Sequence, residues 1–371
     1  MATDPAVPQK HAVLFHGKCT EYLALWLSNL TLTILTLGIY SAWATVHRRR
    51  YFYQNTEIDG DRFTYHGRPL DILQGRIIVI AALILLLILS ATMPDFVVIF
   101  ILVFLALMPW LIINRWRYNA LMSRYRGQQF NYHCRPARAY WSLYLCPLLL
   151  FIAWYLVVSI VGLVASDCES LTRSLVLAGL ALVMFIIGLA VVKGMVTTLY
   201  YSLYINNMLF ANRRFKADLI RRDFIKMVLI SILIIMPFII AAGLMIDSLF
   251  LTLLYAMLFA GDWQMSLALM MGNITRLTMI LMVLLVGSRI STAWLSVAQR
   301  NDILNKTRLG ENIQLKSTAH PLAFIGLMLT NSLLVIFTFG LGTPLAEIRL
   351  ARYLAQTTVL EGNLALLNVG N

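Results

Sequence analysis

The sequence predicts an all-α fold: a polytopic α-helical membrane protein with about eight spans, internal repeats of one orientation and amphipathic helices at the cytoplasmic interface. Its 371 residues are 60% hydrophobic and only 13% charged, with a mean hydropathy of +0.77. Soluble proteins carry about 25% charged residues, so the composition excludes a soluble domain. Uncharged apolar runs of spanning length recur along the chain, and one basic, aromatic-rich unit returns at fixed offsets.

The apolar runs divide the chain into segments, because about 20 apolar residues cross the hydrocarbon core as a helix. We expect a polar N-terminal segment (1–22), a multi-pass membrane domain (23–346) and a C-terminal tail (347–371). The eight expected spans lie near residues 23–46, 77–93, 96–113, 141–165, 174–200, 227–246, 277–297 and 321–342. A further run, 249–271, is interrupted by Gly261 and Asp262, which favours an interfacial or re-entrant helix there.

The repeated unit is an apolar span that runs into a basic, aromatic-rich stretch and ends in a short polar turn. A gapless shift by 67 residues relates eight residues of the first copy to identical residues of the second. Trp43, Arg48, Arg50, Tyr51, Gly60, Phe63, Tyr65 and His66 correspond to Trp110, Arg115, Arg117, Tyr118, Gly127, Phe130, Tyr132 and His133. A shift by 302 relates residues 29–60 to 331–362, and fainter copies begin at Asn207 and Asn305. Repeats of one orientation indicate a modular membrane protein.

The basic stretch of each copy predicts a helix that leaves the bilayer and lies along the headgroups. Arginine stems and the rings of Trp43, Trp110, Tyr51 and Tyr118 suit that depth. Gly60 and Gly127 then supply a turn conformation, and Phe63 and Phe130 point back to the membrane or to a neighbouring copy. The alternative is that these stretches are only topogenic loops with anchoring aromatics.

The charge distribution excludes nucleic acid as the partner of this chain, although its net charge is +13. Of 30 lysines and arginines, 22 lie in the segments 48–76, 115–138, 213–226 and 300–316. This asymmetry places the four segments in the cytoplasm. The expected partner is the lipid bilayer with its anionic lipids, whose headgroups would contact Arg48, Arg49, Arg50, Arg115 and Arg117.

Residues 15–67 resemble the opening of the YjgN family of bacterial inner-membrane proteins, through FHGKCTEYLALW, ILTLGIYSAW and HRRRYFYQNTEIDG. The similarity extends through 119–134, 207–216 and 297–318. The resemblance implies a multi-pass protein of the bacterial inner membrane. It implies no catalytic or binding residues, because the function of the family is not established.

Polar residues inside the expected spans are candidates for function. Arg289 lies in the middle of its span, where an arginine costs at least about 3 kcal/mol unless it faces protein or water. Lys193 is explained by snorkelling to the interface. Asn29 and Asn331 are equivalent positions in the first and last spans, so they either join these spans or line a hydrophilic path.

The sequence contains no HExxH, GxSxG, Walker-type or GxGxxG motif, and we therefore expect no enzyme, no cofactor and no metal site. His66 and His133 are 67 residues apart, and hydrogen bonding within the repeated turn is the default interpretation. Two functions remain: a transport or channel-like protein, or a non-transporting structural protein that binds or organises anionic lipids.

The topology contains a conflict. Eight plain crossings with four cytoplasmic basic segments put both termini outside, whereas the equivalence of Arg50 and Arg352 requires the same side for both. First and last spans that are broken at Gly38 and Gly340 would resolve the conflict, because both termini would then lie inside.

Overall fold

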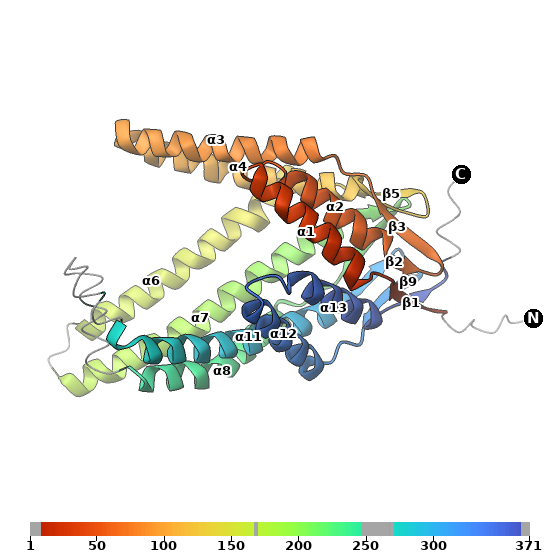
Figure 1. The fold of residues 1–371 in the computed structure, drawn as a ribbon. Helices are drawn as coiled ribbons and strands as arrows, with labels where there is room; N and C mark the ends of the chain where they lie inside the picture. Colours follow the sequence, from red (N-terminus) through yellow and green to blue (C-terminus); the bar gives the residue numbers. More distant parts are fainter. Residues whose placement is uncertain (1–8, 167–169, 247–254, 256–266, 268–270, 365–371) are drawn as a thin grey trace, which may run out of the picture.

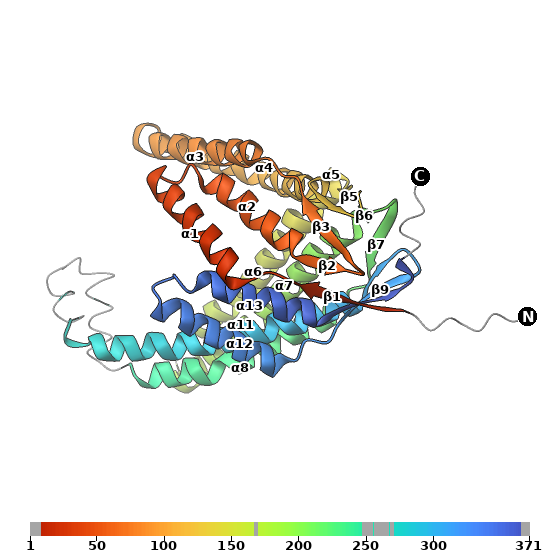
Figure 2. The same cartoon turned by 45° about the vertical axis from the view of Figure 1, so that its right-hand side comes forward.

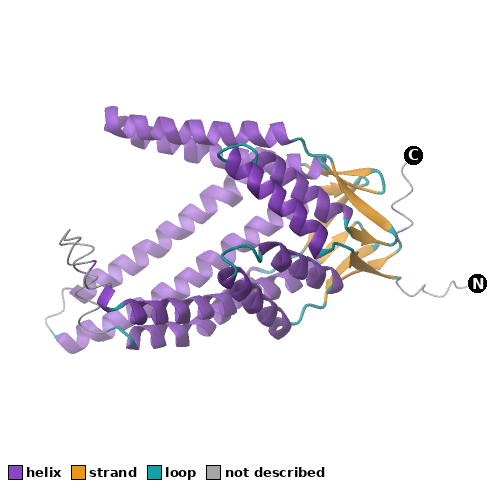
Figure 3. Ribbon diagram, in the orientation of Figure 1, coloured by secondary structure: helices purple, strands orange, loops and turns teal. Residues whose placement is uncertain are grey.

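The computed structural model describes residues 9–166, 170–246, 255, 267 and 271–364. Long helices extend to one side of a small antiparallel barrel, and both ends of the described chain lie at the barrel (Figures 1 and 3). The run 249–271, for which the sequence predicts an interfacial or re-entrant helix, lies almost entirely outside the described residues.

The barrel consists of ten short antiparallel strands in the order β1-β10-β9-β8-β7-β6-β5-β4-β3-β2. β1 pairs with β10 through residues 10–12 and with β2 through residues 13–15, which closes the ring. The strands are β1 (Lys10–Phe15), β2 (Thr56–Ile58), β3 (Asp61–Tyr65), β4 (Ser123–Tyr125), β5 (Gln128–Tyr132), β6 (Met208–Phe210), β7 (Arg213–Ala217), β8 (Thr307–Leu309), β9 (Ile313–Ser317) and β10 (Thr358–Gly362).

A pair of helices connects each strand that leaves the barrel to the next strand that enters it. The pairs are α1 (Cys19–Leu35) with α2 (Ser41–Gln54), α3 (Pro69–Thr92) with α4 (Pro94–Leu121), the continuous α5 (Pro136–Tyr140), η1 (Trp141–Leu145) and α6 (Cys146–Ser166) with α7 (Leu171–Asn206), α8 (Arg221–Leu244) with α11 (Ile274–Asn305), and α12 (Pro321–Phe337) with α13 (Thr343–Gln356). Each pair contacts the next pair along the chain, and α13 contacts α1, so the pairs form a closed ring. Figure 2 shows them all on one side of the barrel.

The all-α prediction was wrong, because the polar turns of the repeat are β-hairpins. Asp59 and Gly60 have φ values of 52° and 83°, and Arg126 and Gly127 have 50° and 74°. Positive φ at both central residues defines the type I′ turn, whose twist matches that of paired strands. Strands of three to six residues are too short to cross a bilayer, which needs about 9–11. The barrel therefore lies outside the hydrocarbon layer.

The expectation of amphipathic helices along the headgroups was also wrong. The basic, aromatic stretch of the first copy is the end of α2, and that of the second is the end of α4; both lead directly into barrel strands. Pro109 is buried inside α4, which continues past it to Leu121. Each stretch thus joins the helix ring to the barrel.

Six described helices are long and apolar enough to cross a membrane: Pro69–Thr92, Asp95–Leu121, Pro136–Val164, Thr172–Asn206, Arg221–Leu244 and Ile274–Asn305. The expected spans 23–46 and 321–342 are not single helices. α1 and α12 end after 17 residues each, about 26 Å, which is shorter than the hydrocarbon core. Leu37 and Gly38, and likewise Phe339 and Gly340, have positive φ, which ends a right-handed helix.

The two short pairs are helical hairpins with apolar tips. Leu37 is 95% exposed and Phe339 is 98% exposed. Fully exposed apolar side chains at loop tips are typical of a segment immersed in lipid. Each hairpin leaves the barrel and returns to it, as each longer pair does, so the ends of the barrel strands and both termini lie on one side of the molecule.

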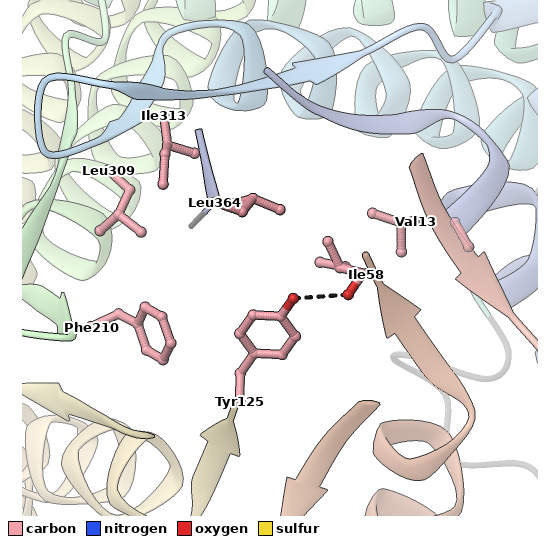
Figure 4. Packing of buried hydrophobic residues seen from close by; sticks show 8 residues of the cluster. Val13, Ile58, Tyr125, Phe210, Leu309, Ile313 and Leu364 are labelled. Atoms are coloured by element: carbon pink, nitrogen blue, oxygen red, sulfur yellow. Dashed lines mark hydrogen bonds between the residues drawn. The ribbon is translucent and has the colours of Figure 1, made fainter. Parts of the chain in front are cut away.

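Side chains from most of the strands fill the barrel. The buried cluster consists of Val13, Ile58, Tyr125, Phe210, Leu309, Ile313, Ala355 and Leu364. Figure 4 shows seven of them pointing toward one another, with the Tyr125 hydroxyl donating a hydrogen bond of 2.8 Å to the backbone oxygen of Ile58. Arg126 donates to the backbone oxygen of Leu364 at 3.2 Å and to Asp59 at 2.7 Å, so it holds the C-terminal segment at the mouth.

Candidate functional site

A cavity of about 680 Å³ lies on the inner faces of α1 and α2 and reaches α4. Its wall carries Trp26 and Leu30 of α1, and Arg48 and Arg49 of α2. Asn29 of α1 lies opposite His47 of α2, so these four residues lie at similar depths along the hairpin, with Leu30 nearest the tip. Arg115 of α4 completes the basic part of the wall. Pockets of about 300–1,000 Å³ are the usual size for small-molecule sites.

The three arginines are unequally neutralised. Arg48 forms an ion pair of 3.0 Å with Glu347 of α13. Arg49 donates hydrogen bonds to the Tyr65 hydroxyl at 2.8 Å and to the Asn119 side-chain oxygen at 2.5 Å, both of which are neutral acceptors. Arg115 has no hydrogen-bonding or ionic partner among the residues that the structure describes. Of the three positive charges, only that of Arg48 is thus paired with a described carboxylate.

Glu347 also joins the first and last helix pairs, because it accepts a hydrogen bond of 2.5 Å from the Tyr22 hydroxyl of α1. Burial raises the pKa of Tyr22 above its ordinary value, and the adjacent carboxylate raises it further. Tyr22 therefore remains a neutral donor at physiological pH. It directs one Glu347 oxygen toward α1 while the other pairs with Arg48.

A second cavity of about 340 Å³ lies closer to the barrel and shares Tyr53 with the first. Its wall includes the rings of Phe63, Phe130 and Tyr204, together with the polar side chains of Asn119 and Ser123. Phe63 and Phe130 stack with ring centroids 6.5 Å apart. Both rings pack against the buried cluster that fills the barrel.

The structure brings together only three of the five arginines for which the sequence predicts lipid contact. Arg48, Arg49 and Arg115 line the larger cavity. Arg50 instead donates to the backbone oxygen of Gly67 at 3.3 Å, and Arg117 is exposed on α4 outside both linings.

Asn29 and Asn331 are both buried, but they do not meet. Asn29 faces a ring nitrogen of His47 at 3.2 Å, and Asn331 donates to the backbone oxygen of Ala346 at 3.2 Å. Each asparagine joins the two helices of its own hairpin. Arg289 on α11 and Lys193 on α7 are exposed and line neither cavity.

The remaining residues of the repeated motif occupy corresponding places. The Tyr51 hydroxyl accepts from the N–H of Lys18 at 2.9 Å and donates to its backbone oxygen at 2.8 Å. Tyr118 forms the same two bonds with Arg68, and Tyr353 with His320. The tryptophans differ, because Trp43 stacks on Tyr40 whereas Trp110 is exposed. His66 and His133 are exposed and follow barrel strands, and their backbone N–H groups donate to the backbone oxygens of Met122 and Asn207.

Sequence reasoning missed the polar residues that surround the arginines: Tyr22, Tyr53, Asn119 and Glu347. Asn119 and Tyr53 follow the repeated arginines within the same stretches, so the spacing of the repeat carried a signal for them. Glu347 is more than 300 residues from Tyr22 and Arg48, and only the closure of the ring brings it to the cavity.

Comparison with known proteins identifies the family. The family described as "Bacterial protein of unknown function (DUF898)" matches residues 10–370. The "Inner membrane protein YjgN" of Salmonella typhimurium is 29% identical over 97% of this chain and 91% of its own length. That of Escherichia coli K12 is 28% identical over 95% and 89%. No solved structure matches the chain. The relatives are named inner membrane proteins, which agrees with the six helices of spanning length. Because the family matches almost the whole chain, the chain belongs to the DUF898 family, and its resemblance to YjgN is confirmed.

Proposed function

We propose that this protein binds anionic lipids in the cytoplasmic half of the inner membrane, through the cavity that Arg48, Arg49 and Arg115 line. The observation that carries the proposal is the charge of this cavity: three arginines line it, and of these only Arg48 forms an ion pair with a described carboxylate. Arg48 and Arg115 are exposed, so their charges are open to a ligand, and a phosphate group would neutralise them. Arginine is suited to phosphate, because its planar fork donates two parallel hydrogen bonds.

The surroundings of the cavity favour a lipid over a soluble anion. Its wall passes from Arg48 and Arg49 to Leu30 of α1 and Ala44 of α2, which lie nearer the apolar hairpin tip. A phospholipid changes in the same way along its length, from a charged phosphate at one end to apolar acyl chains at the other. A bound lipid would therefore keep its chains on the membrane side and its phosphate at headgroup depth.

The sidedness in this proposal rests on charge. The hairpins β2–β3, β4–β5, β6–β7 and β8–β9 and the helix ends beside them contain the four basic segments. The positive-inside rule assigns such segments to the cytoplasm. The barrel and both termini then lie in the cytoplasm, and the strand–helix–helix–strand unit is the internal repeat of a multi-pass protein.

Transport is the competing function. A path along the barrel axis is disfavoured, because large apolar side chains from several strands fill the described part of the barrel. Transport would therefore require movement of the helix pairs against one another. The absence of flux of inorganic phosphate or of lipid in reconstituted vesicles would leave the binding proposal intact.

Lipid co-purification tests the proposal. The protein is extracted in mild detergent, and its bound phospholipids are quantified by mass spectrometry beside those of an Arg49→Gln/Arg115→Gln variant and of an Arg117→Gln control. We expect anionic phospholipid to be enriched with the wild type and the control, and reduced by tenfold or more in the double variant, since each charge-assisted hydrogen bond contributes about 1.5–3 kcal/mol. Equal anionic lipid in all three proteins would refute the proposal.

A further inference from the structure

The second cavity contains hydrogen-bonding groups that the protein does not use. The Asn119 side-chain oxygen accepts from Arg49, and its amide nitrogen has no acceptor among the described residues. The Tyr53 hydroxyl is already hydrogen-bonded to the Ser123 hydroxyl at 3.1 Å, and the Ser123 hydroxyl lies 2.8 Å from the backbone oxygen of Asn119, to which it can donate its own proton. The Tyr204 hydroxyl makes no hydrogen bond within the described chain. Two side chains with free donors, Asn119 and Tyr204, therefore line a cavity of about 340 Å³.

The apolar part of this cavity consists of aromatic rings. Phe130 stacks on Phe210 with ring centroids 4.4 Å apart, and Phe63 stacks on Tyr125 with ring centroids 4.7 Å apart. Side chains of the barrel thus hold both phenylalanines in place. Tyr204 packs edge-on against Trp116 at 5.1 Å. Rigid rings beside unpaired donors suit a small group with hydroxyl oxygens and aliphatic C–H bonds, such as a polyol.

One hydrogen bond links a residue in the wall of the larger cavity to a residue in the wall of the smaller one. Arg49 lines the larger cavity, and Asn119, which it contacts at 2.5 Å, lines the smaller one. Tyr53 belongs to both walls. A phosphate at the arginines would thus place its substituent beside Asn119, Tyr53 and Tyr204, on the side away from the acyl chains.

We propose that the second cavity binds the polyol headgroup of a phospholipid such as phosphatidylglycerol, whose phosphate lies at Arg48, Arg49 and Arg115. This assignment rests on the proposed function and adds headgroup selectivity to it. Hydroxyl oxygens accept from the free donors of Asn119 and Tyr204, and glycerol C–H bonds pack on Phe63 and Phe130. A cationic ethanolamine headgroup would be repelled by the arginines, and phosphatidic acid, which has no substituent on its phosphate, would leave the donors unpaired.

The test compares phosphatidylglycerol with phosphatidic acid of identical acyl chains. Binding of each lipid to the full-length protein in detergent is titrated by native mass spectrometry, for the wild type, Tyr204→Phe and Tyr200→Phe. Tyr204→Phe keeps the ring that packs on Trp116 and removes only the hydroxyl. Tyr200 lies one turn away on α7, packs on Trp116 and lines neither cavity, so it is the matched control.

We expect the wild type to bind phosphatidylglycerol about tenfold or more tightly than phosphatidic acid, since more than one hydrogen bond distinguishes them. Tyr204→Phe should weaken phosphatidylglycerol about fivefold and leave phosphatidic acid unchanged, whereas Tyr200→Phe changes neither. Equal affinities that still depend on Arg115 would overturn the headgroup assignment and leave the proposed function standing. If neither lipid binds, the proposed function itself is contradicted.

Discussion

At the scale of single residues, the repeated tyrosines show how a sequence motif becomes architecture. Tyr51, Tyr118 and Tyr353 each bond to both backbone groups of the residue that precedes a helix. That residue stands at the junction between a barrel strand and its helix pair. The tyrosine lies in the second helix of the same pair, so its hydroxyl fixes the point at which the first helix leaves the barrel.

Removal of one such hydroxyl should be measurable. Tyr118→Phe keeps the ring but leaves the N–H and the carbonyl of Arg68 without this partner. We expect the free energy of unfolding to fall by about 0.5–1.5 kcal/mol, observed as a lower midpoint of thermal unfolding in detergent. Tyr155→Phe, on an exposed ring of α6, is the control. Equal midpoints for both variants would show that the tyrosine bonds do not stabilise the junction.

The residues that recur in sequence could be identified without the structure, but their roles could not. The shift by 67 residues relates Arg48 to Arg115, and both line the larger cavity. The same shift relates Arg50 to Arg117, and neither does. Which arginines face the cavity depends on how α2 and α4 are rotated by their neighbours, and that information is not local.

At the scale of elements, the hairpins of the barrel were predictable and the closed barrel was not. Asp59-Gly60 between TEI and DRFTY carries the strongest short-range hairpin signal. The strands were hard to recognise because a helix precedes them directly, and because three to five residues are too few to show the alternation of apolar and polar side chains that marks a strand. Closure depends on the pairing of β1 with β10, which lie at opposite ends of the chain.

The tips of the two short helix hairpins meet the strictest requirement of a lipid environment. Irregular backbone is tolerated in lipid only where its polar groups are satisfied. In the second tip, the N–H groups of Phe339, Gly340 and Leu341 bond to carbonyls of the preceding turn, and that of Gly342 bonds to the Thr338 hydroxyl at 2.7 Å. The first tip repeats this pattern, with Tyr40 bonded to Thr36 at 2.9 Å.

Substitution of the tip threonine tests this arrangement. Thr338→Val preserves the shape of the side chain and removes the acceptor of the Gly342 N–H. We expect destabilisation by about 1–3 kcal/mol, the cost of an unsatisfied polar group away from water. In Thr92→Val, the matched control, only a bond from the hydroxyl to the carbonyl of its own helix is lost. Unfolding midpoints that fall equally for both variants would show that the tip has no special requirement.

At the scale of the whole molecule, the paired helices resolve the topological conflict in the sequence. Eight plain crossings were expected, but residues 23–46 and 321–342 each form part of a hairpin that returns to the barrel. Every connection that leaves the barrel therefore begins and ends with a helix that meets a strand, and both ends of the described chain lie beside the barrel. Hydropathy could not distinguish a broken helix from a span, because the tips are as apolar as the helices they join.

Cysteine accessibility tests the sidedness. The cysteines are introduced one at a time into a chain whose four native cysteines are replaced by serine. Those at Gln9 and Gln128 lie at the barrel end, and the one at Ser170 lies at the opposite end of α7. We expect an impermeant thiol reagent to label only Ser170→Cys in intact cells and all three after permeabilisation. Labelling of Gln9→Cys but not Gln128→Cys in intact cells would contradict the common location of the barrel and the N-terminus.

The basic cavity depends on the whole molecule, because its charges come from α2 and α4 and their single counter-charge comes from α13. Native mass spectrometry of the protein released from nanodiscs that contain phosphatidylglycerol tests it most directly. The account predicts one retained phosphatidylglycerol per chain, which survives activation that strips the other lipids and is lost in Arg49→Gln/Arg115→Gln. Retention of the same lipid by wild type and double variant, or the absence of any retained lipid in the wild type, would contradict it.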